Sequence, residues 1–211
     1  MKINHLSASF FYIFLSSLIC FPLLACHPQV RPDKLTDTSD QTIITMKGSD
    51  SDNLGSNIIP KTGQAKTYMQ ADDGDLQAGK PWPKPRFTDH KDGTVADHLS
   101  GLMWTLNADK AEGEVDWEQA VSGAKTCTDG GYTDWRLPNR NELDSLIDLG
   151  RHNPALPTGH PFIGVQPSYY WSSTTPANNE DHAWIVHFYI GFVTHDDKGS
   201  SHHVWYVREG L

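Results

Sequence analysis

The fold of this chain is decided by the stretch Asp134-Trp135-Arg136-Leu137-Pro138-Asn139-Arg140-Asn141-Glu142-Leu143. An Asn followed three residues later by a Glu is typical of a capping box, in which each side chain accepts a hydrogen bond from the other residue's backbone N–H. A proline just ahead of the cap strengthens this signal. The stretch predicts an extended segment that runs into a capped helix. Its apolar stripe is Leu143, Leu146 and Ile147, and Gly150 is expected to end it.

Arg136 lies immediately before this helix start. A guanidinium at such a corner is well suited to pair with a half-buried carboxylate, and the bidentate contact would fix the turn. A second interpretation, in which Arg136 contacts a ligand, stays open at this point.

Upstream, short β-strand patterns precede a first helix. Residues 86–90 and 94–98 predict two strands joined by the turn Lys91-Asp92-Gly93, and residues 102–106 predict a third. Asp116 is a plausible N-cap with Gln119 three residues on, and apolar residues then recur at helical spacing up to Cys127. Gly130-Gly131 is expected to stop this helix.

Downstream, the residue pattern predicts four further β-strands, at residues 169–173, 183–189, 192–195 and 204–208. Strands, then two helices, then strands again predict an α+β domain rather than an alternating α/β fold.

The N-terminal region has the pattern of an export signal. Lys2 is followed by the apolar run 6–25 and by Leu23-Leu24-Ala25-Cys26, which resembles the bacterial lipobox, whose cysteine receives a diacylglycerol. We expect residues 1–25 to be a cleaved lipoprotein signal peptide, Cys26 to be lipidated, and membrane lipid to be a partner through it. An ordinary signal peptide or an uncleaved membrane anchor is the alternative.

Residues 26–61 are polar and lack an apolar period, so we expect a flexible tether before a folded domain at 62–211. The formal net charge is −9, which argues against nucleic acid as a partner, since such binding needs clustered Lys and Arg. Once Cys20 leaves with the signal and Cys26 carries lipid, Cys127 stands alone. An internal disulfide is then excluded, and stability has to come from the core.

Several motifs together resemble the Lcl C-terminal domain family of bacteria. They begin with a lead-in, Thr62-Gly63-Gln64 and Asp73-Gly74-Asp75, and continue through Pro85-Arg86-Phe87-Thr88-Asp89, Asp92-Gly93-Thr94-Val95 and Gly101-Leu102-Met103-Trp104. The stretch quoted above matches the centre of the family pattern. Tyr170-Trp171-Ser172-Ser173-Thr174 and Val207-Arg208 match its end.

The resemblance implies a loop-rich, C-type-lectin-like fold in which two helices pack against short antiparallel β-sheets. The family's namesake is a surface adhesin that binds glycosaminoglycans, so the resemblance also implies a binding role. A calcium-dependent lectin site is not expected, because Gln166-Pro167-Ser168 is a poor version of the lectin triplet and no Trp-Asn-Asp occurs.

Aromatic residues are the main candidates for ligand contact. The Trp residues are spread over the domain, which is typical of a core, while Tyr169, Tyr170 and Trp171 are the best candidates for stacking on a sugar. Together with Arg136 they form the predicted ligand-binding set.

Metal and catalytic residues are not expected. Asp89, Asp92 and Asp97 lack the spacing of an EF-hand loop, and Asp-Gly is what a hairpin turn needs. The C-terminal histidines His182, His187, His195, His202 and His203 are the best candidates for a metal site, and whether they bind a metal stays open at this point. His182 and His187 are an odd number of residues apart, so in one strand they face opposite sides. Cys127 looks like a core residue.

The sequence therefore predicts a non-enzymatic binding module of the bacterial envelope, anchored most naturally at the outer membrane, with a polysaccharide, glycosaminoglycan or other surface component as partner and with no cofactor. Two alternatives remain: an enzyme with an unfamiliar site of His and carboxylates, and a purely structural envelope lipoprotein.

Overall fold

The computed structural model describes residues 59–210. The predicted signal peptide, the lipidation of Cys26 and nearly all of the tether lie outside the described residues. Within 59–210, no helix has the length and apolar character needed to cross a bilayer.

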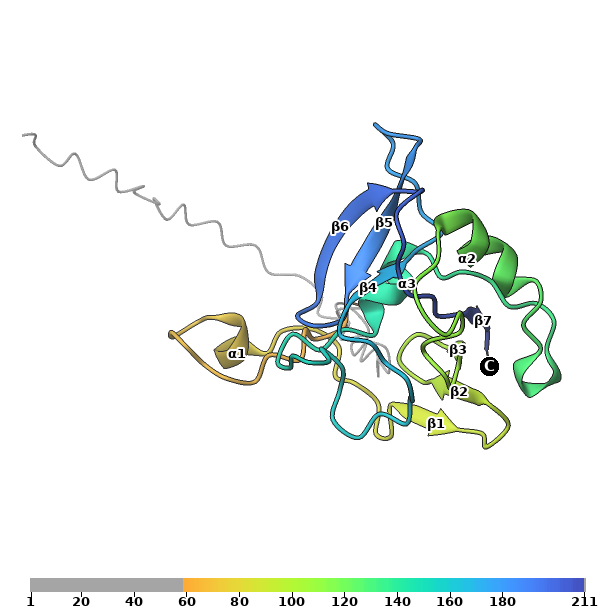
Figure 1. Ribbon diagram of the computed structural model, residues 1–211. Helices are drawn as coiled ribbons and strands as arrows, with labels where there is room; N and C mark the ends of the chain where they lie inside the picture. The colour runs from red at the N-terminus through yellow and green to blue at the C-terminus, as the bar shows by residue number, and fades with distance from the viewer. Residues whose placement is uncertain (1–58, 211) are drawn as a thin grey trace, which may run out of the picture. The chain divides into compact units, whose positions relative to one another are not determined.

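The domain is α+β, as predicted, and has two antiparallel sheets (Figure 1). The first sheet has the strand order β1-β2-β3-β7 and the second the order β4-β5-β6. The strands are β1 Phe87–Asp89, β2 Thr94–Asp97, β3 Leu102–Thr105, β4 Tyr169–Trp171, β5 His182–His187, β6 Phe192–Asp197 and β7 Val207–Glu209. The helices are α1 Asp73–Leu76, α2 Trp117–Ala124 and α3 Arg140–Ser145, with a short 3₁₀ turn at Asp129–Gly131.

Both predicted capping boxes are present. Asp116 and Gln119 cap α2 reciprocally, and Asn139 and Glu142 cap α3 in the same way. The hairpin turn after β1 is also confirmed, since β1 and β2 pair in antiparallel register. The segment that enters α3 is not a strand, however: Arg136 makes only an isolated bridge to Val207.

Helix α3 ends earlier than the prediction at Gly150, and its hydrogen bonds give the reason. In a continuing helix the Ser145 carbonyl would accept from the N–H of Leu149. Here that carbonyl accepts from the guanidinium of Arg86, while the Leu149 N–H donates to the Thr62 carbonyl at 2.9 Å. Residues from the N-terminal side of the domain thus bond to the backbone groups that would have continued α3, and Thr62 is held against the loop after α3.

Helix α2 also ends before its predicted stop at Gly130-Gly131. Its last turn tightens, because the N–H groups of Thr126 and Cys127 donate three residues back, to Gly123 and Ala124. Cys127 is nevertheless buried, as the apolar stripe predicted.

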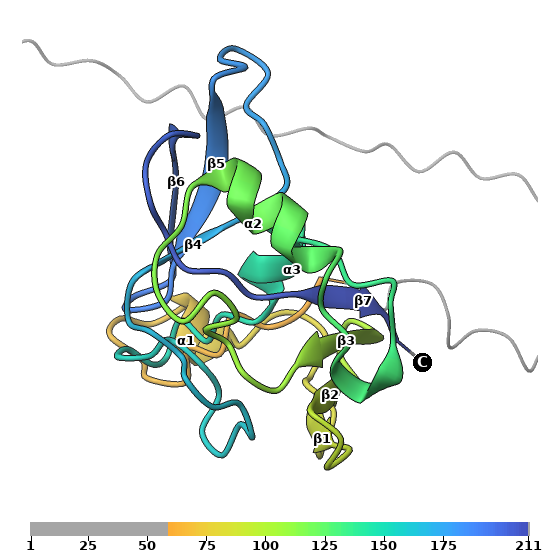
Figure 2. The same ribbon diagram turned by 45° about the vertical axis from the view of Figure 1, so that its right-hand side comes forward.

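The core lies where α2, α3 and the two sheets meet (Figure 2). One cluster centres on Trp205, whose ring packs edge-on against Phe162 at 4.6 Å and against Trp104 at 5.5 Å between ring centroids. The other contains Trp135, Trp171 and Cys127. Burying several large aromatic rings gives a short, loop-rich chain enough apolar contact to fold without a disulfide.

Candidate ligand-binding pocket

The predicted aromatic contact set is largely part of the core. The side chains of Tyr170 and Trp171 are fully buried, so neither can stack on a sugar, and this part of the prediction is wrong. The indole Nε1 of Trp171 donates to the Val115 carbonyl, and the hydroxyl of Tyr170 accepts from the Gln166 N–H. Tyr169 is half-buried, with its ring 4.3 Å from that of His187 between centroids.

Arg136 has the structural role that the corner suggested. Its guanidinium makes a bidentate pair with Glu142, with both N–O distances 2.7 Å, and also donates to Glu209 at 3.1 Å. The side chain is 38% exposed, but these carboxylates already occupy it. Arg136 therefore fixes the start of α3 through these two carboxylates.

The three aspartates considered for calcium make local contacts instead. Asp89 pairs with Lys91, Asp92 accepts from Thr94 within the hairpin turn, and Asp97 is buried against Arg86. Among residues 59–210, no three His, Cys, Asp or Glu side chains converge as metal ligands.

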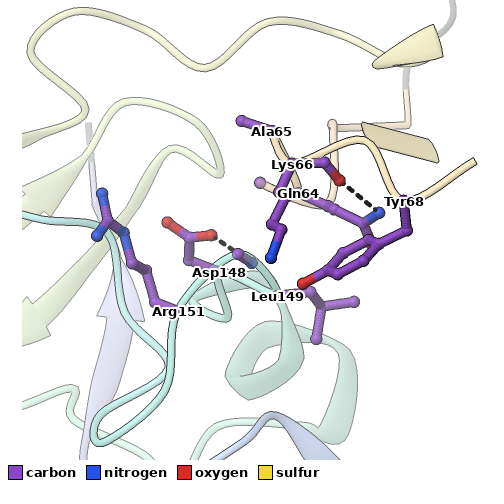
Figure 3. Close-up of a pocket in the computed structure, with 9 residues that line it drawn as sticks. Gln64, Ala65, Lys66, Tyr68, Asp148, Leu149 and Arg151 are labelled. Atoms are coloured by element: carbon purple, nitrogen blue, oxygen red, sulfur yellow. Dashed lines mark hydrogen bonds between the residues drawn. The ribbon is translucent and has the colours of Figure 1, made fainter. Parts of the chain in front are cut away.

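An open pocket of about 460 Å³ lies elsewhere, between the N-terminal segment and the loop after α3 (Figure 3). Its lining comes from residues 63–66, Tyr68 and residues 148–151. The volume is in the range of small-molecule sites. The two walls are far apart in the sequence and are joined by the hydrogen bond from Leu149 to Thr62.

Glycines allow the two walls to approach closely. A Cβ atom on Gly150 would lie 2.5 Å from the Gly63 carbonyl oxygen, and one on Gly63 would lie 2.1 Å from Oδ1 of Asp148. Gly63 also has φ +91°, which strains any other residue. The Thr62 hydroxyl donates to Asp73, which connects the two lead-in motifs and closes the segment into a loop.

Asp148 is the buried polar group of the pocket, only 6% exposed. Its Oδ1 accepts from the Gly150 N–H at 2.8 Å. Burial raises the pKa of this carboxyl above its ordinary value, although the Gly150 hydrogen bond and the charges of Arg151 and Arg86 act in the opposite direction. A titratable group whose pKa is shifted by burial inside a pocket is a frequent mark of a functional site.

Exposed polar and aromatic groups complete the lining. In Figure 3, Asp148 lies between Arg151 on one side and Lys66 with Tyr68 on the other. The Tyr68 side chain is 73% exposed, and the Lys66 amine lies 4.7 Å from the centre of its ring. Arg151 is exposed, and its guanidinium makes no hydrogen bond to any residue in 59–210. The pocket thus offers two cations, an exposed ring and a protected carboxyl.

The sequence carried only part of this site. Thr62-Gly63-Gln64 is one of the family motifs, and a glycine such as Gly63 or Gly150 is a signal of close backbone approach. Asp148 and Arg151 follow α3 without any motif, and Lys66 and Tyr68 lie in a polar segment with no periodicity. Only the tertiary contact between the two segments brings them together.

The comparisons with known proteins agree with the motifs. The model of the Lcl C-terminal domain matches residues 93–208, from the turn before β2 to the middle of β7. One wall of the pocket, residues 148–151, falls inside this match, and the other wall precedes it. A search of curated proteins finds no similar sequence. Since the match covers more than half of the chain, the protein is a member of the Lcl C-terminal domain family.

Proposed function

We propose that this protein is a non-enzymatic binding module of the bacterial envelope and that its pocket takes an acidic sugar of a polysaccharide. The observation that carries the proposal is the placement of two cationic side chains, Lys66 and Arg151, around one hollow on a chain whose net charge is −9. On an acidic protein, such a local pair selects for a carboxylate or sulfate group.

The residues that line the pocket can bind the ring and hydroxyl groups of a sugar as well as its acidic group. A guanidinium without a hydrogen-bond partner in 59–210 can bind a carboxylate or sulfate through two parallel hydrogen bonds. Tyr68 presents an exposed ring for stacking, and Gln64 lines the same hollow with an amide for the hydroxyl groups. The exposed phenol of Tyr68 and the half-buried amide of Gln64, whose Nε2 donates to the Lys66 carbonyl at 3.3 Å, supply neutral contacts for a saccharide.

A longer chain of sugars has room to continue. A second hollow of about 360 Å³ adjoins the first, since Leu149 lines both. Trp82 and Lys61 line this second hollow, and the Trp82 indole is fixed by a hydrogen bond to the Lys61 carbonyl at 3.0 Å. A half-buried indole and an amine beside the pocket extend the same kind of surface.

Envelope anchoring is part of the proposal and rests on Cys26 in the motif Leu23-Leu24-Ala25-Cys26. Metabolic labelling with a fatty-acid analogue should mark the wild-type chain and not Cys26→Ser. Equal labelling of both chains would exclude lipidation at this residue.

The binding proposal is tested by titrating the full chain with a sulfated polysaccharide, a uronic-acid polysaccharide and neutral dextran. A charge-assisted hydrogen bond contributes about 1.5–3 kcal/mol, so Lys66→Gln or Arg151→Gln should weaken binding of an acidic polymer by roughly 10- to 150-fold. Binding should also weaken with added salt. Lys125→Gln, the same charge change on an exposed lysine outside the pocket, is the matched control.

Two results would contradict the proposal. One is binding of dextran as tight as that of the acidic polymers. The other is an equal loss of affinity in Lys125→Gln and in the pocket variants, which would indicate non-specific attraction. Tyr68→Ala separates stacking from charge, because it should weaken binding without changing the salt dependence.

An acid catalyst is a second candidate, and the raised pKa of Asp148 is the observation that favours it. Incubation of the same polysaccharides with wild type and Asp148→Asn, followed by assay of new reducing ends, tests it. Cleavage by the wild type that is lost in Asp148→Asn would establish an enzyme.

A further inference from the structure

The hairpin of β5 and β6 brings together two histidines that lie thirteen residues apart. Trp184 pairs with His195 and His182 pairs with Asp197, so His182, Trp184 and His195 share one face of the hairpin. Figures 1 and 2 both show β5 and β6 side by side. The Nδ1 atoms of His182 and His195 are 3.0 Å apart, and the ring planes are inclined by 67°.

This separation fits two nitrogens on one metal ion. Metal–imidazole bonds are about 2.0–2.1 Å long, so two nitrogens at a right angle lie about 2.9 Å apart, whereas a tetrahedral angle separates them by about 3.3 Å. The observed 3.0 Å is closer to the right-angle value; it is the length of an imidazole–imidazole hydrogen bond, whose proton a bound metal ion would displace. Right-angled N and O ligands are typical of Cu²⁺ and Ni²⁺, and Cu²⁺ binds the more tightly of the two.

The local charge favours a cation. Glu180 and Asp181 precede His182, and Asp197 lies directly opposite it across the strands. The amine of Lys198 also lies near this end of the hairpin, where it donates to the Glu180 carbonyl and lies 4.5 Å from the centre of the Trp117 ring. The three carboxylates of Glu180, Asp181 and Asp197 outnumber the two cations near this end of the hairpin, Lys198 and Arg140.

We propose that His182 and His195 bind a Cu²⁺ ion on the exposed face of the β5–β6 hairpin. Two imidazole nitrogens are the protein ligands, and water fills the other positions, because no third His, Cys, Asp or Glu converges with them within residues 59–210. An ion held in this way is exchangeable and open to solvent. The site is separate from the pocket described above and does not depend on its ligand.

The fluorescence of Trp184 can be used to follow metal binding at this pair of histidines. Its ring is 5.4 Å from that of His195 between centroids, and the guanidinium of Arg140 lies 4.8 Å from its centre, which holds the indole in place. Bound Cu²⁺ at this distance should quench the fluorescence of Trp184. The Trp184→Phe variant identifies the part of the signal that comes from this residue.

The test titrates the untagged full chain with Cu²⁺ by calorimetry and by tryptophan fluorescence. His182→Ala and His195→Ala should each weaken this binding event at least tenfold and shift the quenching that depends on Trp184 to correspondingly higher Cu²⁺ concentration. His187→Ala is the matched control, since it lies on the same strand but faces the opposite side, and it should bind as the wild type does.

Electron paramagnetic resonance gives an independent measure, because Cu²⁺ on the wild type should couple to two imidazole nitrogens and on His195→Ala to one. Thermal melts show whether each variant is folded. Unchanged affinity and unchanged nitrogen coupling in folded His182→Ala and His195→Ala would overturn the proposal and leave the pair as a simple imidazole–imidazole hydrogen bond.

Discussion

Neutralising Asp97 is expected to destabilise the domain far more than neutralising an exposed charge. Its carboxylate is fully buried and pairs with Arg86 through two N–O contacts of 3.2 Å. It also accepts from the Leu99 N–H and from the Ser100 hydroxyl. The Arg86 side chain is only 5% exposed, so Asp97→Asn would leave a buried guanidinium without its paired carboxylate.

The magnitude follows from that burial. Removing one partner of a buried pair costs about 3–5 kcal/mol, because the remaining charge has lost both water and its partner. Asp97→Asn keeps an oxygen that can accept from Leu99, so the lower figure, about 3 kcal/mol, is expected. For a domain of this size that is a fall in melting temperature of roughly 6–12 °C. In Arg86→Met/Asp97→Asn neither charge remains, and the loss should be clearly smaller than the sum of the two single losses.

Thermal and urea unfolding of wild type, the two single variants and the double variant measure these differences. Lys91→Met is the control, because Lys91 is 82% exposed in its pair with Asp89, and it should melt as the wild type does. A fall of only a degree or two for Asp97→Asn would refute the reasoning. Strictly additive losses in the double variant would do so as well.

Three further predictions concern groups whose surroundings are equally well defined. Cys127 is buried and its thiol pKa is raised, first by burial, so thiol reagent should react slowly with the folded chain and rapidly in denaturant; Cys127→Ala should cost about 1 kcal/mol. The pKa of Asp148 is raised above 3.8 in the folded chain, so its ionisation lowers the stability of the fold as the pH rises from 3.8 through the folded pKa. The melting temperature of Asp148→Asn should therefore rise relative to that of the wild type between pH 4 and pH 7. A difference in melting temperature that stays constant with pH would contradict this. Asn139→Ala should lower the free energy of unfolding by about 1 kcal/mol, because a helix cap is lost. Glu142→Gln should lower it by a similar amount, because the ion pair with Arg136 is broken. Urea unfolding measures both changes, and an unchanged stability of Glu142→Gln would contradict the prediction for that variant.

Local signals in the sequence predicted the elements well and their ends less well. Both capping boxes involve residues three apart, so a single stretch of sequence contains all the atoms that form them. The end of α3, in contrast, is set by Arg86 and Thr62, which come from distant segments. A pattern confined to the helix cannot include those partners, and the apolar stripe therefore predicted too long a helix.

The aromatic prediction failed for a related reason. Alternation along a strand identifies one buried face only where the other face meets solvent. β4 is covered on both sides: Tyr170 packs among Phe188, Trp205 and His203, and Trp171 lies within the second core cluster. The pairing of His182 with His195 depends on the β5–β6 register, which is set by the turn before β6 and not by the residue pattern of either strand alone.

The shape of the pocket and its ligand specificity depend on different residues. Gly63 and Gly150 set how closely the two walls approach, and a larger side chain at either position would force them apart. Lys66, Tyr68 and Arg151 are exposed and contribute little to the core, so they can be exchanged at small cost in stability. Substitutions at these three positions could therefore change which ligand is bound while Gly63 and Gly150 keep the shape of the pocket. Proteins that share this domain could in that way bind different surface components.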